Sequence, residues 1–231
     1  MKKRVDGILF DKDGTLFDFH TTWGAWARTI IEDLAARHAV PVGNIADEIH
    51  YDLAAGQFLR SSPIIAGTNR QAAECVARAI PGADIGEIER FLMRSAAHAP
   101  LAPAVPLAPF LTDLRGRGLT LGVMTNDTEF GARAHLATAG VEGLFDFIAG
   151  FDSGHGSKPA PEPLWAFAKA HGLAPARVVM VGDSAHDLIA GRAAGMQTLA
   201  VLTGVAGHDD LSALADAVLP DIGHIPAWLD A

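Results

Sequence analysis

The feature of this sequence that most restricts its fold is a series of short, nearly continuous apolar runs. They span residues 5–10, 119–125, 145–151, 178–182, 198–202 and 217–219. Runs of this length suit strands that are buried on both faces of a parallel sheet. Helical patterns alternate with them, at residues 161–171 and 185–194. The alternation predicts an α/β fold with an open, Rossmann-like parallel sheet as its core.

One long region, residues 17–98, interrupts this alternation with helical patterns and no clear strand. Apolar residues recur there at helical spacing after Thr22, a candidate N-cap: Trp23, Trp26, Ile30 and Leu34. We interpret the two tryptophans as core packing. Further helices are expected over residues 45–56, 69–80 and 84–96, before a connector with four prolines over residues 98–109. We therefore predict an all-helical domain, residues 17–98, inserted into an α/β core made of residues 1–16 and 99–231.

The composition excludes several classes of partner. The formal net charge of −9 argues against a nucleic-acid binder, which needs a basic face. No apolar run approaches the roughly 18 residues of a membrane span, and the run after the basic start is too short for a secretory signal. With Cys75 as the single cysteine, no internal disulfide can form. We expect a cytoplasmic protein that binds neither nucleic acid nor membrane.

Polar side chains follow three of the expected strands at the point where each strand ends. They are Asp11 and Asp13 after the first run, Thr125 and Asn126 after the second, and Asp183 after the fourth. A further polar element, Ser157-Lys158-Pro159, precedes the helix expected from residue 161. Ligands of open α/β sheets bind outside the carboxyl ends of the strands, so we expect these groups to converge.

The acidic residues in this set predict a metal site. Asp11, Asp13, Asp183 and Asp187 on one rim would repel one another, and a hard divalent cation removes that repulsion. Mg²⁺ prefers oxygen ligands and commonly bridges carboxylates and substrate phosphate. The sequence offers no Cys-x-x-Cys or His-x-x-x-His cluster for zinc, and we interpret His186 as exposed or structural.

A phosphate beside such a cation needs donors and positive charge, which Thr125, Asn126 and Lys158 can supply. Asp11 is then a candidate nucleophile that forms an aspartyl phosphate. Asp13 can protonate the leaving oxygen and later take a proton from water. The partner expected from this chemistry is a small phosphorylated metabolite.

Each pattern has an ordinary structural explanation when it stands alone. Asp-x-Asp-Gly-Thr can be a turn or a fragment of a calcium loop, and Gly-Asp-x-x-x-Asp can be an N-cap with a solvated acid. A lone Ser-Lys-Pro is usually a surface loop. Their occurrence together, in this order and at these elements, favours a functional site.

With these motifs the chain resembles the haloacid dehalogenase superfamily of phosphatases. The resemblance covers nearly the whole α/β core, through four segments: Asp11-Lys-Asp-Gly-Thr15, Thr125 with Asn126, Lys158, and Gly182-Asp183-x-x-x-Asp187. It implies Asp11 as nucleophile and Asp13 as general acid/base. It also implies Mg²⁺ held by the Asp11 side chain, the Asp13 backbone carbonyl and Asp183, with Asp187 behind them or paired with Lys158.

The insert is similar to the helical cap of phosphoglycolate phosphatase-like members, which closes over small substrates and sets specificity. Phosphoglycolate is the substrate that this resemblance suggests. Polar candidates in the insert, which we interpret as solvated surface, are His20, Arg60, Ser61, Ser62 and Arg70. Lys12 departs from the bulky apolar residue that relatives commonly carry. In an extended segment it would point away from Asp11 and Asp13, toward an acid or solvent behind the site.

Three other readings use the same residues. A phosphosugar mutase shares the aspartyl phosphate and differs in where the phosphoryl group goes. A phosphoaspartate receiver module also combines Asp, Thr and Lys at sheet ends, but the large insert and the Gly-Asp-x-x-x-Asp segment argue against it. A catalytically silent binding protein would have no need to retain both Asp11 and Asp13. A Mg²⁺-dependent phosphomonoester hydrolase is the function that the sequence favours.

Overall fold

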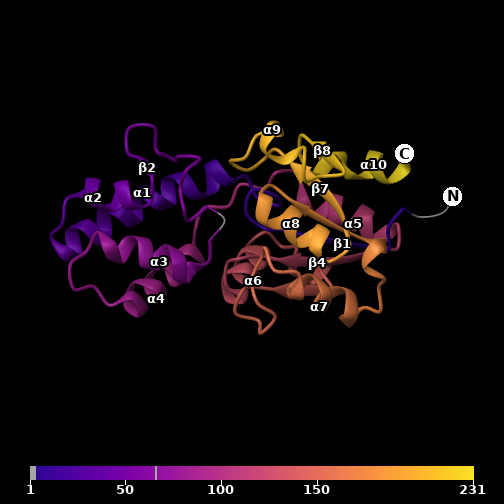
Figure 1. The fold of residues 1–231 in the computed structure, drawn as a ribbon, viewed down its shortest axis with the longest axis horizontal. Helices are drawn as coiled ribbons and strands as arrows, with labels where there is room; N and C mark the ends of the chain where they lie inside the picture. The colour runs from indigo at the N-terminus through magenta and orange to yellow at the C-terminus, as the bar shows by residue number, and fades with distance from the viewer. Residues whose placement is uncertain (1–3, 66) are drawn as a thin grey trace.

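The computed structural model describes residues 4–65 and 67–231, and over these ranges the chain forms two lobes (Figure 1). In the larger lobe six strands form one parallel sheet with the order β5-β4-β1-β6-β7-β8. The strands are β1 (Gly7–Phe10), β4 (Thr120–Met124), β5 (Phe147–Ala149), β6 (Val178–Gly182), β7 (Gln197–Val201) and β8 (Ala217–Leu219). The predicted α/β fold class is confirmed, and β1 lies at the centre of the sheet.

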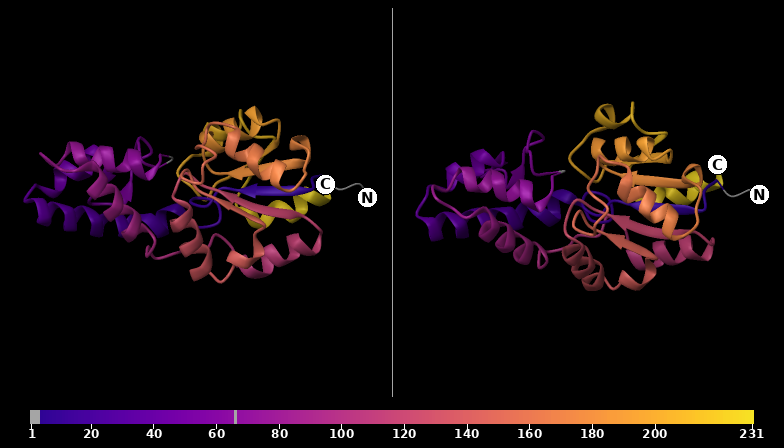
Figure 2. Two further views of the ribbon diagram at one scale, coloured as in Figure 1. Left: turned by 90° about the horizontal axis from the view of Figure 1, so that it is seen from below. Right: turned by 60° about the horizontal axis from the view of Figure 1, so that its bottom comes forward.

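Helices cover both faces of this sheet, because successive residues of a strand point to opposite sides. Ile8 and Phe10 of β1 pack in one apolar cluster with side chains of α5 (Leu107–Gly116) and α10 (Ile225–Asp230). Leu9 packs in another cluster with α7 (Glu162–Ala170) and α8 (Ala185–Ala193). The views in Figure 2 show the resulting layers. The remaining elements of this lobe are α6 (Glu129–Thr138), α9 (His208–Leu211), η1 (Glu142–Leu144), η2 (Pro175–Arg177) and η3 (Ile222–His224).

The smaller lobe is a helical insert between β1 and α5, and its members surround their own apolar cluster. The insert consists of α1 (Phe19–His38), α2 (Val42–Glu48), α3 (Asn69–Arg78), α4 (Ile85–Ala96) and a short antiparallel ribbon, β2 (Tyr51–Asp52) with β3 (Gln57–Phe58). The helix expected over residues 45–56 thus ends early, and the ribbon replaces its second half.

The N-cap of α1 is Asp18 rather than Thr22. The Asp18 carboxylate accepts a hydrogen bond from the Thr21 amide at 2.8 Å, as a capping side chain does. Thr22 lies one turn inside the helix, fully buried, where its hydroxyl oxygen accepts a hydrogen bond from the Ala102 amide at 3.2 Å. The Thr22 side chain therefore joins α1 to the chain segment that leaves the insert.

The chain enters and leaves the insert side by side. The Asp18 amide donates to the Ala102 carbonyl at 2.8 Å, and the Ala104 amide donates to the Leu16 carbonyl at 2.9 Å. Between these bonds Phe17 and Pro103 form an antiparallel bridge. The predicted proline connector is shorter than residues 98–109, since α5 begins at Leu107. Pro109 lies in its first turn, where a backbone N–H has no intrahelical partner.

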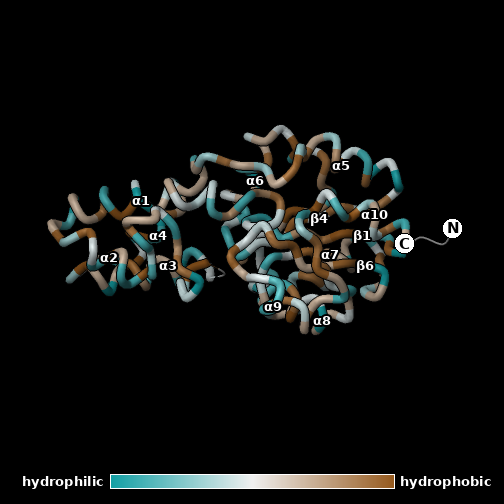
Figure 3. Tube along the Cα trace, turned by 90° about the horizontal axis from the view of Figure 1, so that it is seen from above, coloured by the Kyte–Doolittle hydropathy of each residue, from teal (hydrophilic) through white to brown (hydrophobic). Residues whose placement is uncertain are grey.

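The most apolar segments of the chain lie where the sheet and the helices pack against one another (Figure 3). Apolar colour concentrates along the central strands and on the inner sides of the helices (Figure 3). In the part of the chain that the structure describes, no helix combines the length and the apolar character needed to cross a bilayer.

Candidate active site

Three strand ends meet at the carboxyl edge of the sheet because β1 lies between β4 and β6. Asp11 follows β1 directly, and its amide donates to the Val181 carbonyl of β6 at 2.8 Å. Thr125 follows β4, and Asp183 follows β6. All three side chains are buried. The topology thus brings together residues that are far apart in the sequence.

Two glycines make room for the Asp183 carboxylate. A Cβ on Gly14 would lie 2.3 Å from Asp183 Oδ2. Gly14 also has a φ of +81°, a backbone conformation that residues other than glycine rarely adopt. A Cβ on Gly204 would lie 1.7 Å from the same oxygen. Asp183 is therefore enclosed by backbone from the loops after β1 and β7.

Three carboxylates form the cluster best suited to a cation. Asp11, Asp183 and Asp187 each offer one oxygen, and these oxygens lie within 4.8 Å of one another. Burial raises the pKa of Asp11 to about 7, and the nearby Asp187 and Asp13 charges add to that effect. Burial, together with the Asp11 and Asp187 charges, also raises the pKa of Asp183 well above its ordinary value. Three clustered carboxylates exceed the single positive charge of Lys158, and an oxygen-only donor set of this kind fits a hard divalent cation.

Lys158 is the positive charge in this cluster. Its Nζ lies 2.5 Å from Asp11 Oδ1 and 2.6 Å from Asp187 Oδ1, and the residue is 4% exposed. Burial alone would lower the pKa of Lys158, but these two carboxylates raise it above its ordinary value. The ammonium group therefore stays charged beside Asp11.

The Asn126 side chain positions the Lys158 backbone, a contact that the predicted phosphate-binding role of Asn126 did not include. The Asn126 amide donates to the Lys158 carbonyl at 2.9 Å and accepts from the Lys158 N–H at 3.0 Å. This reciprocal pair engages both ends of the amide. Thr125 and Asn126 both line the cavity described below, and the Thr125 hydroxyl oxygen accepts a hydrogen bond from the Asp127 amide at 3.1 Å.

The Asp13 carboxylate faces the helical insert rather than the other acids. Its Oδ1 accepts a hydrogen bond from the Trp23 indole N–H at 3.0 Å, and its Oδ2 lies 2.9 Å from Lys12 Nζ. Trp23 packs in the apolar cluster of the insert, as predicted, and the bond to Asp13 is an addition to that packing role. A hydrogen bond from Trp23 thus connects the insert to Asp13 at the edge of the sheet.

Lys12 does not point away from Asp13, because the chain turns immediately after Asp11. Its ammonium group is fully buried and contacts Asp13, Asp127 Oδ2 at 2.9 Å and His135 Nδ1 at 2.8 Å. The expected contact with an acid is present, and it comes from Asp127. Lys12 thus forms ion pairs with two carboxylates, those of Asp13 and Asp127.

The His135 ring connects this network to the insert. Because Lys12 has only donors, His135 Nδ1 accepts, and Nε2 then carries the proton and donates to the Ala96 carbonyl at 2.7 Å. Burial and the Lys12 charge lower the pKa of His135, in agreement with a neutral ring. Ala96 is the last residue of α4.

Asp127 and His135 were missed by the sequence predictions. The available signal was Lys12 itself, since a lysine inside a buried segment requires a nearby acid. Asp127 follows Thr125 and Asn126 directly, so it belonged to the same strand end. His135 has no comparable signal, because its position two turns along α6 becomes relevant only once the helices pack.

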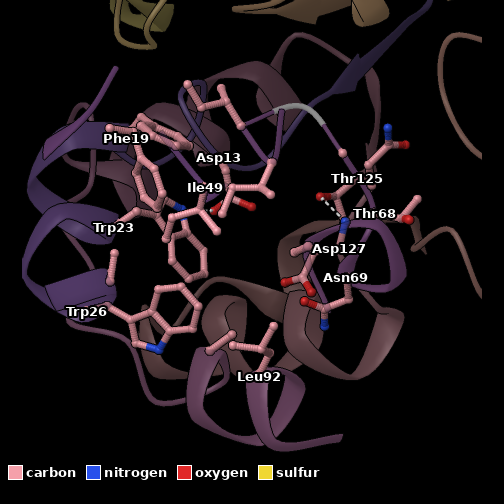
Figure 4. A pocket seen from close by; sticks show the side chains of 18 of the residues that line it. Asp13, Phe19, Trp23, Trp26, Ile49, Thr68, Asn69, Leu92, Thr125 and Asp127 are labelled. Carbon is pink, nitrogen blue, oxygen red and sulfur yellow. Dashed lines mark hydrogen bonds between the residues drawn. The ribbon is translucent and has the colours of Figure 1, made fainter. Parts of the chain in front are cut away.

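A cavity extends from the carboxylates into the insert and is lined by residues of both lobes. Figure 4 shows Thr125 and Asp127 on one side and Phe19, Trp23 and Trp26 on the other. His186, at the start of α8, is half-buried and lines the same cavity. The carboxyl edge of the sheet and the insert therefore share one ligand-sized space.

Known sequences of one hydrolase family and of curated phosphatases match this chain. A sequence model described as haloacid dehalogenase-like hydrolase matches residues 5–195. Phosphoglycolate phosphatase from Xylella fastidiosa strain Temecula1 is 32% identical over 206 residues, which cover 88% of this chain and 82% of that protein. Phosphoglycolate phosphatase from Neisseria meningitidis is 39% identical over 117 residues, 49% of this chain and 48% of that protein.

Solved structures share the fold. CbbY from Rhodobacter sphaeroides in complex with phosphate superposes with a TM-score of 0.75 at 22% identity, over 98% of this chain and 100% of that chain. An HAD phosphatase from Thermococcus onnurineus gives a TM-score of 0.68 at 21% identity, over 97% of each chain. Both comparisons span the insert as well as the sheet.

Proposed function

Because this chain belongs to the haloacid dehalogenase-like hydrolases and is a phosphoric monoester hydrolase, we propose that it cleaves a small phosphomonoester through a phosphorylated Asp11. The observation that carries this proposal is the placement of the Asp11 carboxylate beside the Lys158 ammonium group, at 2.5 Å, with Asp183 in the same cluster. A nucleophile, a phosphate-binding cation and the ligands of a metal thus adjoin one another.

In the first step an Asp11 oxygen forms a bond to phosphorus, and the bond between phosphorus and the ester oxygen breaks. The leaving oxygen takes the electron pair of that bond and a proton from Asp13, which releases the alcohol. In the second step water attacks phosphorus while Asp13 takes a proton from it. The bond to Asp11 then breaks, which restores the carboxylate and releases inorganic phosphate. Lys158 and the Thr125 hydroxyl orient the phosphoryl oxygens throughout.

The donor set fits Mg²⁺, and we assign its binding to the Asp11 side chain, the Asp13 backbone carbonyl and Asp183. Asp187 holds Lys158 and completes the acidic cluster from behind. When bound, Mg²⁺ neutralises some of the carboxylate charge and stabilises the charge on the phosphoryl oxygens.

We further propose that residues 1–16 and 99–231 are the catalytic core and that residues 17–98 are a cap. The cap carries the far wall of the cavity, and its Trp23 holds Asp13. Its closure over the site would exclude water while the ester is cleaved. The names of the relatives make phosphoglycolate one candidate substrate, which the cavity lining described below tests.

Hydrolysis of a generic phosphate ester by the purified protein, with Mg²⁺ and with a chelator, tests this proposal. We expect release of inorganic phosphate that requires Mg²⁺ and is lost in Asp11→Asn. Asp113→Asn, a substitution of a half-exposed acid on α5, is the matched control and should keep the activity. Turnover that survives both the chelator and Asp11→Asn contradicts the mechanism.

A further inference from the structure

We infer that the alcohol moiety of the preferred substrate is uncharged, apolar and about the size of one ring, unlike the carboxylate-bearing alcohol of phosphoglycolate. This inference rests on the proposed function, since it concerns the group that the reaction releases. It is carried by the side chains that the insert turns toward the sheet edge.

The wall that the insert contributes to the cavity is almost entirely hydrocarbon. Its aromatic and aliphatic members come from separate elements of the insert and include Phe58. Figure 4 labels Phe19, Trp23, Trp26, Ile49 and Leu92 among them. Binding of an apolar group at such a wall is favoured because apolar surface leaves water, whereas a charged group would find no cation among the described residues there.

A second negative group on the substrate would meet no cation of its own. Among the described residues that line the cavity, Lys158 is the one lysine or arginine, and it already contacts Asp11 and Asp187. The other basic group, His186, belongs to the core. Five aspartates also line the space, namely Asp11, Asp13, Asp127, Asp183 and Asp187. A carboxylate next to the ester would therefore be desolvated without a charged donor.

The insert does contain arginines, but those of the described residues lie outside the cavity lining. Arg60 reaches Asp210 at 3.4 Å, on the outside of the core. Arg70 pairs with Glu74 at 3.2 Å and Glu89 at 3.1 Å. The remaining polar candidates behave similarly: Ser62 donates to the Ile49 carbonyl at 2.6 Å, and Ser61 contacts His50 at 3.0 Å. The insert thus has arginines that could pair with a carboxylate, but none of the described ones lines the cavity.

The size of the space limits the ligand. The cavity volume is about 130 Å³. An apolar protein cavity of about 150 Å³ accommodates benzene, and this cavity must also admit the phosphoryl group beside Asp11, so a single ring is the upper limit for the alcohol.

One polar group of the insert points to a further detail of the ligand. Asn69, at the start of α3, lines the cavity, and its side-chain Nδ2 is buried without a hydrogen-bond partner among the described residues. Buried donors normally have partners, so a ligand acceptor would satisfy this one. Asn69 thus offers the alcohol moiety one neutral hydrogen-bond donor in a largely apolar wall.

The test compares esters that differ in the alcohol but not in the type of leaving group. Benzyl phosphate, 4-carboxybenzyl phosphate and phosphoglycolate are all esters of primary alcohols. We expect kcat/KM for benzyl phosphate to exceed that for phosphoglycolate at least tenfold, and the added carboxylate to remove that advantage. Higher kcat/KM for phosphoglycolate overturns the inference and leaves the proposed function intact. Failure to hydrolyse all three esters, and a generic aryl phosphate as well, contradicts the proposed function itself.

A variant of the wall gives an independent measurement. Ile64→Arg places a cation at the cavity and should shift the kcat/KM ratio toward the two carboxylated esters. Val42→Arg adds the same charge at an exposed position of α2 outside the cavity and should leave the ratio unchanged. Equal ratios in both variants and in the unmodified protein contradict the assignment of this wall to the alcohol.

Discussion

The two walls of the cavity differ in kind. The wall from the core is polar and carries the charged groups of the site, among them Lys158 with its partners Asp11 and Asp187. The wall from the insert is built of aromatic and aliphatic side chains that pack on one another. Under the proposed function the difference separates two tasks: the core would supply the groups that any phosphomonoester requires, and the insert would contact the alcohol, by which one ester differs from another.

The most severe way to break the core wall is to remove the nucleophile. Asp11→Asn should lower kcat by about 10³-fold or more, because a catalytic group of this kind has no substitute in the site. Steady-state phosphate release measures the effect. An intact fold is expected, since the amide can still accept a hydrogen bond from Lys158, and circular dichroism checks this point. Residual activity within tenfold of the unmodified protein would assign the attack to another group.

Removal of the proton donor should be the next largest effect. Asp13→Asn keeps the shape and the acceptor for Trp23 but cannot transfer a proton, so both chemical steps should slow by about 10²- to 10⁴-fold. Rapid-quench measurement of phosphoenzyme and phosphate separates the two steps. An unchanged rate for either step would exclude the acid/base role in that step.

Substitution of Lys12, the buried lysine that contacts Asp13 and Asp127, should lower stability as well as activity. Lys12→Met leaves the Asp13 and Asp127 carboxylates without their cation, and loss of one partner from a buried pair costs about 3–5 kcal/mol. Urea denaturation measures the change in the free energy of unfolding. The double variant Lys12→Met with Asp127→Asn should recover some of that loss, because it removes one unpaired charge. Equal stability of the single and double variants would show that Asp127 is not the partner that matters.

The smallest effect is expected from removing the hydrogen bond between the Trp23 indole and the Asp13 carboxylate, the one polar contact described here that joins the insert to Asp13. Trp23→Phe keeps a ring in the wall but removes the N–H that donates to Asp13, and a bond to a charged group is worth about 1.5–3 kcal/mol. The lower end of that range corresponds to a fall in kcat of about tenfold, which is the effect we expect. Trp26→Phe is the matched control, because Trp26 lies on the same helix and donates to Ser95, at 3.0 Å. Equal losses in the two variants would mean that wall packing, not the contact with Asp13, accounts for the effect.

The core was largely predictable from the sequence, and the insert wall was not. The apolar run over residues 178–182 coincides with β6, and the acid that follows it lies at the site, because a buried parallel strand leaves a pattern that one segment carries by itself. The contact of Lys12 with Asp13 escaped prediction because it depends on a turn at the strand end. The hydrocarbon wall depends on which faces of the insert's helices meet, and apolar periodicity in a helix does not tell a cavity lining from a packed interface.

The paired crossing between the lobes has a consequence for how such a protein can change over generations. Because the chain leaves the core at Phe17 and returns beside it at Pro103, the ends of the insert are already joined by hydrogen bonds. Any replacement segment whose ends come together can be accepted at that junction without rebuilding the sheet, as domain insertions generally require. An insert exchanged in this way leaves the sheet in place, but the new segment has to supply its own contacts to Asp13 and His135, which Trp23 and the Ala96 carbonyl make here.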